Sequence, residues 1–299
     1  MSKKIIVLGS TNTDMVIQGK KIPAPGETVS DGSFFLNPGG KGANQAVAVA
    51  RLAKDAKCVF LAKVGNDNFG KETARRLKKD GIDARLVVDP KEASGIALLM
   101  VGANGQNCIS VALGANGTFS VEDVQPFVKE LQSAAALLMQ LETPLPTVLF
   151  AAKTAHQAGV PVILNPAPAR KLPAALYRAV DWITPNESEA ELLTGVKVQD
   201  ARSAQMATDI LMKRGVGHVI ITMGSKGCWC GDCARLFPCH KVKAIDCVAA
   251  GDTFNGAFTV ALTEGRSCAD AIAFAQSACA ISVTRRGAQP SIPYRKELP

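Results

Sequence analysis

The sequence predicts an α/β fold, in which helices cover both faces of a mostly parallel β-sheet. Short β-branched runs alternate with amphipathic stretches of helical spacing through most of the chain. The 299 residues, 47% of them hydrophobic and 20% charged, are enough to bury a large core. The final third changes to two successive alanine-rich apolar helices. These observations favour a layered body of helix, sheet and helix.

The expected strands follow one another along the chain. They are KIIVLG (4–9), CVFLAKVG (58–65), ALLMQLE (136–142), PVILNP (161–166), WITP (182–185) and HVIITMG (218–224). A helical pattern over residues 43–54 precedes the second strand, and helical spacing follows each strand after it. Such alternation is typical of parallel sheets. Residues 250–264 and 268–284 then predict two helices packed on one face of the sheet.

Two segments, residues 13–37 and 95–113, break this alternation. The first contains Pro23, Pro25 and Gly26, and the second has Asn104-Gly105 between two alternating runs, which indicates a hairpin. We expect these segments to form a small antiparallel sheet that stands off the main body. A sheet that small cannot bury both faces alone, so it covers a cleft, pairs with a second copy of the chain, or does both.

Charge and composition exclude several classes of protein. The net charge is +8, but the basic residues are scattered, with no run of five or more, so we expect no nucleic-acid partner. The apolar run near the N-terminus is too short for a signal peptide or a membrane span. Nine cysteines in a chain this long do not resemble a secreted disulfide framework. We therefore expect a cytoplasmic protein with reduced thiols and no membrane contact.

One group of cysteines has to be weighed as a zinc site. Within thirteen positions lie Cys228, Cys230, Cys233, Cys239 and His240. The spacing differs from paired C-x2-C knuckles, and the segment alternates like a hairpin with its turn at residues 231–232. Alternation would send the sulfurs to both faces of that hairpin. We therefore expect hairpin cysteines without a metal.

Known nucleotide-binding patterns fit poorly. Residues 65–72, GNDNFGKE, satisfy most of the P-loop pattern, but Glu72 replaces the hydroxyl that would hold magnesium. The first strand is not followed by G-x-G-x-x-G, so NAD is not expected. It is followed by Asn12 and Asp14, at the edge where open α/β sheets bind ligands. A carboxylate and an amide there suit a polyhydroxy ligand, with a simple Asx-turn as the alternative.

Two other glycine-rich stretches precede helices. In NPGGKGANQ, residues 37–45, the glycines let a ligand approach the backbone, and the following helix offers free amides. In AAGD, residues 249–252, the amides lie at a helix N-terminus, which is a site for anions. Asp252 has two interpretations at this stage. It is either a helix N-cap or a base directed at a substrate hydroxyl.

Nearly the whole chain resembles the ribokinase branch of the PfkB carbohydrate kinase family. The motifs that carry the resemblance are GSTNTD, GGKGANQA, MQLE, LNPAPAR, TPNESEAE, TMGSKG, AAGDTFNG and TRRGAQPS. Each glycine loop alone is a weak signal, whereas all of these motifs in this order and at this spacing are very specific.

The resemblance implies a ribokinase-like fold, a three-layer α/β sandwich with a four-stranded β lid that also forms a homodimer contact. Residues 1–299 would be one kinase domain, with the lid formed by about 13–37 and 95–113. The implied reaction transfers the γ-phosphoryl group of ATP to the primary hydroxyl of a sugar. In the closest family members the sugar is D-ribose and the product is ribose 5-phosphate.

The resemblance also implies roles for individual residues. Asp252 would be the base, and the amides of Ala249, Ala250 and Gly251 would form an anion hole. The sugar site would be lined by Asn12, Asp14, Gly39, Gly40, Lys41, Asn44 and Glu142. Asn186 and Glu189 would position phosphates and Mg²⁺, and the nucleotide would lie against Thr222, Gly224, Ser225, Gly227 and Gln276. An activating K⁺ would be held, chiefly by carbonyl oxygens, in the loops of Asp246, Val248, Ser282, Arg285, Gly287 and Ser291.

Two positions depart from the family pattern. Asp246-Cys247 stands where the family usually has Asp-Thr, and Gln276 stands where Asn or His is more frequent. Potassium dependence and nucleotide preference therefore stay open. So do two alternatives to a ribose kinase: a kinase for deoxyribose, fructose or a nucleoside, and a sugar-binding regulator that has lost catalysis. Asn12, Asp14 and Asn44 favour a small sugar over a nucleoside, which needs an apolar pocket for its base.

Overall fold

The computed structural model describes residues 3–298, and its centre is a nine-stranded sheet in the order β13-β12-β11-β10-β9-β8-β1-β4-β5. The parallel strands are β1 (Lys4–Leu8), β4 (Lys57–Gly65), β5 (Asp83–Asp89), β8 (Ala136–Met139), β9 (Val162–Leu164), β10 (Trp182–Ile183) and β11 (His218–Thr222). At one edge β12 (Cys228–Cys230) and β13 (Arg235–Phe237) add an antiparallel hairpin. The α/β fold with a mostly parallel sheet is confirmed.

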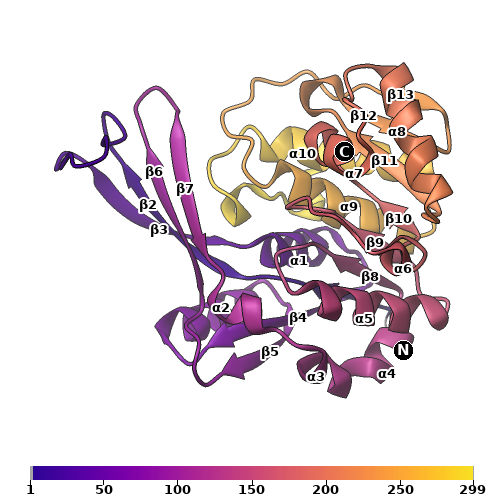
Figure 1. Ribbon diagram of the computed structural model, residues 1–299, viewed down its shortest axis with the longest axis horizontal. Coiled ribbons are helices and arrows are strands. Elements are labelled where there is room, and N and C mark those ends of the chain that lie inside the picture. Colours follow the sequence, from indigo (N-terminus) through magenta and orange to yellow (C-terminus); the bar gives the residue numbers. More distant parts are fainter. Residues whose placement is uncertain (1–2, 299) are drawn as a thin grey trace.

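Helices cover both faces of this sheet (Figure 1). One face carries α5 (Leu145–Gln157), α7 (Glu187–Thr194) and α8 (Ala201–Lys213), with the short α3 (Val121–Val124), α4 (Val128–Gln132) and α6 (Ala174–Tyr177). The other carries α1 (Lys41–Leu52), α2 (Asn68–Lys79), α9 (Ala250–Thr263) and α10 (Cys268–Ser282). In β1, Ile5 and Val7 belong to one core while Ile6 and Leu8 belong to the other. Because both faces are buried, such strands are apolar throughout.

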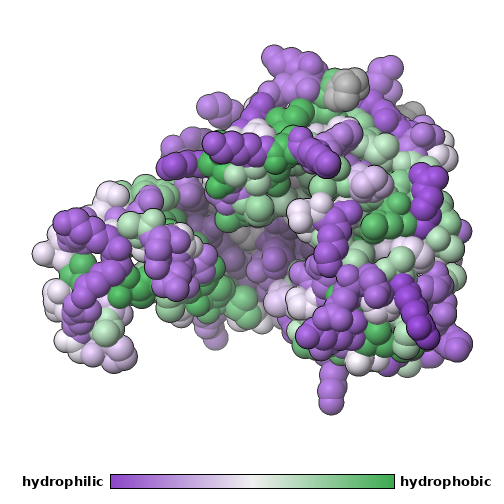
Figure 2. Space-filling model, turned by 90° about the horizontal axis from the view of Figure 1, so that it is seen from above, coloured by the Kyte–Doolittle hydropathy of each residue, from purple (hydrophilic) through white to green (hydrophobic). Residues whose placement is uncertain are grey.

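The lid is a separate four-stranded sheet that projects from the body (Figure 1). Its strands are β2 (Asn12–Gln18), β3 (Ser33–Gly39), β6 (Gly95–Val101) and β7 (Asn107–Ala112), in the order β3-β2-β6-β7. The β6–β7 hairpin is the one that Asn104-Gly105 predicts. The outer pairs are antiparallel, while β2 and β6, which come from separate segments, pair in parallel. Figure 2 shows a hollow between lid and body.

Local capping explains several boundaries. The P-loop-like segment is a strand-to-helix loop, in which the Asp67 side chain accepts the Gly70 amide and caps α2. The helices expected over 250–264 and 268–284 are α9 and α10, which end one and two residues earlier. The C-terminal segment contains the short 3₁₀ turns Gln289–Ser291 and Arg295–Glu297. Within residues 3–298, no helix is both long and apolar enough to cross a membrane.

Candidate active site

Asp252 lies in the first turn of α9 with its carboxylate buried, 7% exposed. Oδ2 accepts a hydrogen bond from Asn44 Nδ2 at 2.9 Å, and Oδ1 accepts one from Gln45 Nε2 at 2.9 Å. Both donors belong to α1, so the carboxylate is held from outside its own helix. The residue at the N-cap of α9 is Ala249 in a left-handed conformation, which makes no side-chain cap. The N-cap interpretation of Asp252 is therefore wrong.

The backbone around Asp252 is open on one side. The Ala250 amide donates to the Cys247 carbonyl at 3.2 Å. Within the described residues, the amides of Ala249, Gly251 and Asp252 have no backbone acceptor. A Cβ placed on Gly251 would meet no atom within 4 Å, so a ligand has room at this helix start. Free amides at a helix N-terminus bind anions.

A cavity of about 690 Å³ brings most of the expected nucleotide-site residues together around α9. Its lining includes Lys41, Asn186, Glu189, Thr222, Gly224, Ser225, Gly227, Ala249, Ala250, Gly251, Asp252 and Gln276. The buried Gln276 donates through Nε2 to the Phe237 carbonyl at 2.9 Å, which ties α10 to β13. Sequence positions from 41 to 276 thus meet at one end of the sheet.

The other expected sugar residues form a polar cluster beside this cavity. Glu142 Oε2 accepts the Ser10 hydroxyl at 2.5 Å and the Lys41 amide at 3.0 Å. Asn12 Oδ1 accepts from Asn116 Nδ2 at 2.8 Å. We call Ser10, Asn12, Asp14, Asn116 and Glu142 the Glu142 cluster. Lys41 joins this cluster to the cavity.

The glycine pair of the GGKG loop allows that close approach. Gly40 has φ +89°, a conformation that disfavours a side chain, and a Cβ there would lie 2.6 Å from Thr11 Cα. A Cβ on Gly39 would meet the Asp14 carboxylate. The loop therefore has to be glycine for the backbone to pass over β2 and start α1.

Burial raises the pKa of three carboxyl groups in this region. It raises the pKa of Asp14 to about 6, with the charge of Glu142 as the second cause and Arg76 opposing both. It raises the pKa of Asp252 against the charge of Lys41 and the hydrogen bond from Asn44. It also raises the pKa of Glu189, where the Asn186 amide opposes the rise. Raised carboxyl pKa values gathered in one place indicate a functional site.

Asn186 and Glu189 form a reciprocal capping box at the start of α7. Asn186 Oδ1 accepts the Glu189 amide at 2.8 Å, and Glu189 Oε2 accepts the Asn186 amide at 2.9 Å. This exchange orients the carboxylate, and both residues line the cavity. A carboxylate and an amide oxygen are hard ligands of the kind that Mg²⁺ prefers, so the pair fits that ion.

The expected cation loops lie side by side. Asp246 accepts the Val248 amide through Oδ1 and the Gly287 amide through Oδ2, each at 2.9 Å. The Ser282 and Ser291 hydroxyls are 2.9 Å apart. The Arg285 side chain points to an ion pair with Glu297, so only its backbone is placed to serve these loops. These two hydrogen bonds hold the two loops together through Asp246, so their backbone carbonyl groups lie close to one another.

Several site residues were missed by the sequence-based prediction. Gln45 bonds Asp252, and Gln45 Nε2 also donates to Asn165 Oδ1 at 3.1 Å. Ser10 and Asn116 organise the Glu142 cluster. Ser10 and Gln45 lie inside the GSTNTD and GGKGANQA motifs, but site roles were predicted only for neighbouring residues of these motifs. Asn116 lies outside these motifs, and only its complete burial distinguishes it from an ordinary loop residue.

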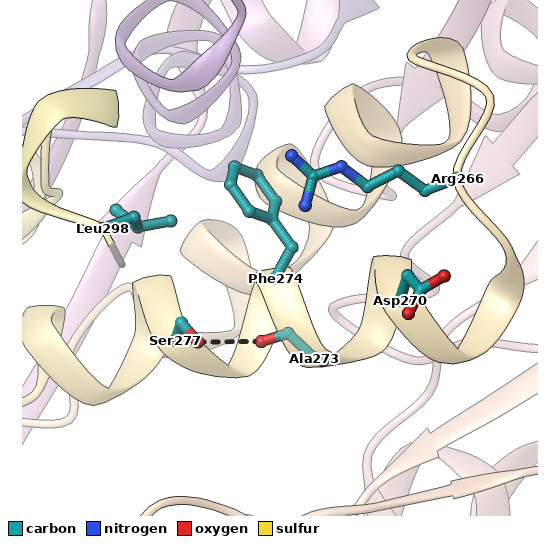
Figure 3. Close-up of a pocket in the computed structure, with 6 residues that line it drawn as sticks. All are labelled: Arg266, Asp270, Ala273, Phe274, Ser277 and Leu298. Carbon is teal, nitrogen blue, oxygen red and sulfur yellow. Dashed lines mark hydrogen bonds between the residues drawn. The ribbon is translucent and has the colours of Figure 1, made fainter.

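A second hollow, of about 370 Å³, lies on the outer side of α10 (Figure 3). Figure 3 shows the Arg266 guanidinium beside the Phe274 ring, and Arg295 stacks over the same ring. Both arginines also pair with Glu264. Both arginines are held by ion pairs and by stacking on Phe274, which is the pattern of a structural contact.

Comparison with known proteins identifies the family of the chain. The family model of pfkB carbohydrate kinases matches residues 2–295. The chain is 45% identical to a ribokinase of Haemophilus influenzae over 99% of this chain and 97% of that protein. It is 37% identical to a deoxyribokinase of Salmonella typhi, over 97% and 95% respectively.

A solved structure of Arabidopsis thaliana ribokinase, complexed with ribose and ATP, has the same fold. It superimposes with a TM-score of 0.90 at 32% identity, covering 99% of this chain and 97% of that one. The family model spans almost the whole sequence, and the relatives are matched nearly from end to end. The chain therefore belongs to the pfkB family of carbohydrate kinases.

Proposed function

We propose that this chain transfers the γ-phosphoryl group of ATP to the 5-hydroxyl of D-ribose and so forms ribose 5-phosphate. As a pfkB family member the chain is an ATP-dependent sugar kinase, and curated relatives at 45% and 39% identity are ribokinases. The position of Asp252 carries the proposal. Its buried carboxylate lies where the cavity meets the Glu142 cluster, next to free amides of α9.

The Glu142 cluster and Asn44 supply the sugar side of the site. Asn44 donates to Asp252, and its Oδ1 is buried with no hydrogen-bond partner within residues 3–298. A buried acceptor without a partner is costly, so a ligand hydroxyl that donates to it is favoured. Asp14 and Glu142 add carboxylate acceptors. A polyhydroxy ligand matches this set better than a nucleoside base, which needs apolar contacts.

Asp252 acts in this proposal as the base that takes the proton of the sugar 5-hydroxyl. Asn44 and Gln45 fix the direction of the carboxylate, so little reorganisation is needed during the reaction. Phosphoryl transfer has a loose transition state in most analyses, so most of the catalysis is positioning and charge neutralisation. The free amides of Ala249 and Gly251 would stabilise charge on the transferring group.

Cations complete the proposed site. Asn186 and Glu189 would hold Mg²⁺, which when bound neutralises charge on the ATP phosphates. Carbonyl oxygens of the Asp246 and Gly287 loops would hold K⁺ and would fix the backbone that starts α9. The burial that raises the pKa of Glu189 favours its neutral form, and a bound cation would restore the carboxylate.

The lid has an apolar face that we propose is covered by a second copy of the chain. Strand register places Ile17 opposite Phe34 and Met100, and all three are exposed. Leu36 and Leu98 lie on the same face, each opposite Met15. Apolar patches on an isolated sheet mark interaction sites. Light scattering should give a homodimer that Phe34→Glu converts to a monomer, and a monomeric wild type would rule the dimer out.

Residues 1–299 would then act as one kinase domain with an inserted lid. All nine cysteines are free thiols, which supports the proposal of a reducing, cytoplasmic location. The proposed kinase activity and the proposed homodimer require no nucleic-acid or membrane partner.

A coupled ADP-release assay with D-ribose, 2-deoxy-D-ribose, D-fructose and adenosine tests the substrate. We expect the highest kcat/KM for D-ribose. Deoxyribose lacks the 2-hydroxyl group, so its binding would leave a buried polar group of the site without a hydrogen-bond partner. One such loss costs about tenfold or more. The relationship to a deoxyribokinase makes deoxyribose the second candidate. Preference for deoxyribose or adenosine would reject the ribose proposal, and binding without turnover for every sugar would indicate a non-catalytic regulator.

A further inference from the structure

Three cysteine thiols from two distant segments meet away from the proposed kinase site. Cys230 ends β12, Cys233 lies in the turn to β13, and Cys268 is the first residue of α10. Their sulfur atoms all lie within 4.8 Å of one another. The Cys230 and Cys268 sulfurs are 3.5 Å apart. We call these residues the thiol triad.

The triad has the dimensions of a tetrahedral thiolate site. Zn–S bonds of about 2.3 Å in a tetrahedron put neighbouring sulfurs about 3.8 Å apart. One observed separation is 3.5 Å and none exceeds 4.8 Å, so small side-chain rotations would bring the three sulfurs around one ion. A disulfide needs sulfurs about 2.05 Å apart, and within residues 3–298 no cysteine is paired in this way.

The ligand set differs from the one that the hairpin sequence suggests. Cys239 donates to the Ser225 carbonyl at 2.8 Å, and His240 contacts Ser277, so neither joins the triad. Cys228 lies beside Gln276 in the cavity wall. The expected scattering of sulfurs is wrong for Cys228 and Cys230, which both face one core while Trp229 faces the other.

We propose that Cys230, Cys233 and Cys268 bind one thiophilic divalent cation, with Zn²⁺ as the favoured ion. The fourth coordination position would be open to solvent beside Cys233. Three soft thiolate ligands favour Zn²⁺ over Mg²⁺, which needs oxygen ligands. Each thiol that coordinates the ion loses its proton to solvent. Cys233 is exposed, so an ion can reach the triad from the surface.

A bound ion would fasten the β12–β13 hairpin to α10. These two elements already touch through the Gln276 hydrogen bond to Phe237, and both contribute to the wall of the main cavity. The proposal is separate from the kinase activity, because the triad is outside the cavity lining. Binding to the native state alone would raise thermal stability.

Titration of untagged protein, first stripped with chelator and thiol reductant, tests this site. We expect one Co²⁺ per chain with thiolate charge-transfer absorption, displacement of that Co²⁺ by Zn²⁺, and proton release into weak buffer. Cys233→Ser should lower the affinity for Zn²⁺ at least about 100-fold and remove the rise in Tm that Zn²⁺ causes. Cys108→Ser, which alters an exposed cysteine on the lid, is the matched control and should bind as the wild type does.

Because Cys233 is exposed, its serine variant should keep the wild-type circular dichroism spectrum and basal turnover, so lost binding cannot come from unfolding. Cys268→Ser gives a second, independent loss. The proposal is overturned by a stoichiometry far below one, or by Zn²⁺ binding that survives both variants. A disulfide between two triad residues in freshly isolated protein, found by non-reducing peptide mass spectrometry, would overturn it as well.

Discussion

Two groups of buried and half-buried carboxylates in this molecule have opposite electrostatic surroundings. In the first group, Lys63 on β4 lies 3.2 Å from Asp89 and 2.8 Å from Asp123. In the second group are Asp252 and Glu189 of the cavity and Asp14 and Glu142 of the neighbouring cluster. Within residues 3–298, none of these four acids has an ion-pair partner within 4 Å.

Their pKa values diverge accordingly. Hydrogen bonds from the Thr118 hydroxyl and from two backbone amides lower the pKa of Asp89. Burial is the largest single influence on Asp123 and works against its ionisation, but the hydrogen bonds from Lys63 and Ser120 and the charge of Lys63 together outweigh it and lower the pKa. At Asp14, Glu189 and Asp252 burial prevails, and the pKa is raised.

The difference separates charge used for stability from charge reserved for a ligand. An acid that pairs with a cationic side chain of the protein and accepts several hydrogen bonds stabilises the loops around it. Acids that crowd one another without such a partner cost stability, and natural proteins retain that cost where function needs it. Exchanging one residue in each group tests this distinction.

Asp252→Asn should have the largest effect. The amide keeps the size of the side chain but cannot take a proton, so kcat should fall roughly 10³-fold while ribose affinity changes little. The coupled assay gives kcat, and titration calorimetry gives affinity.

Asp270→Asn is the matched control, because Asp270 has the same place in the first turn of α10 but is exposed. It should keep wild-type turnover. Near-normal kcat in Asp252→Asn would remove the base from the proposal, whatever the substrate.

Lys63→Met should have the largest effect on stability. It leaves the buried Asp89 and the half-buried Asp123 without their cation. Breaking a fully buried pair costs about 3–5 kcal/mol, and the partial exposure of Asp123 lowers the expected loss of unfolding free energy to about 2–3 kcal/mol. Urea unfolding measures that loss. Lys57→Met, on the exposed start of the same strand, should change stability little. Equal unfolding free energies for the two variants would show that the Lys63 group is not structural.

Asp14→Asn should change stability with the opposite sign. The folded pKa of about 6 exceeds the ordinary aspartate pKa of 3.8, so the folded state holds the proton more tightly. The contribution of Asp14 to stability is therefore present below about pH 3.8 and is lost as the pH rises to about 6. The variant avoids this loss. Relative to wild type, it should gain roughly 2 kcal/mol between pH 4 and pH 7.

Asp123→Asn provides the contrast across the same pH series. Its pKa is lowered by folding, so its contribution is present above the unfolded pKa and is lost as the pH falls through the folded value. This variant should be less stable than wild type at pH 7, with a difference that shrinks in acid. Parallel pH profiles for the two variants would mean that the two groups do not differ as described.

Local pattern explains what the sequence could predict. Hydrophobic periodicity and glycine punctuation predicted the parallel sheet, the β6–β7 hairpin, and α9 beginning at Ala250. The partners inside the site were a different matter. Gln45 is 207 positions from Asp252, and Asn116 is 104 from Asn12. No local spacing encodes such contacts, because they exist only once the layers have packed.

The same reason explains the errors about single residues. The sequence around Asp252 fits both a helix-capping aspartate and a catalytic base. Only the hydrogen-bond donors on α1 distinguish the two interpretations. Cys268 is 38 positions from Cys230, so the hairpin segment alone could not reveal the triad. Ser10 was overlooked because its partner, Glu142, is 132 positions away.

Ser10→Ala should give the smallest effect, and this effect distinguishes most directly between a role in ligand binding and a role in stability. It removes the hydroxyl that donates to Glu142 Oε2, a hydrogen bond to a charged group, so KM for ribose should rise about tenfold with kcat nearly unchanged. Ser94→Ala removes the equivalent hydroxyl from Asp67, 2.7 Å away in the α2 cap. That control should lower unfolding free energy by about 1 kcal/mol and leave KM alone. If Ser10→Ala lowers stability as Ser94→Ala does and leaves KM unchanged, the Glu142 cluster belongs with the structural carboxylates.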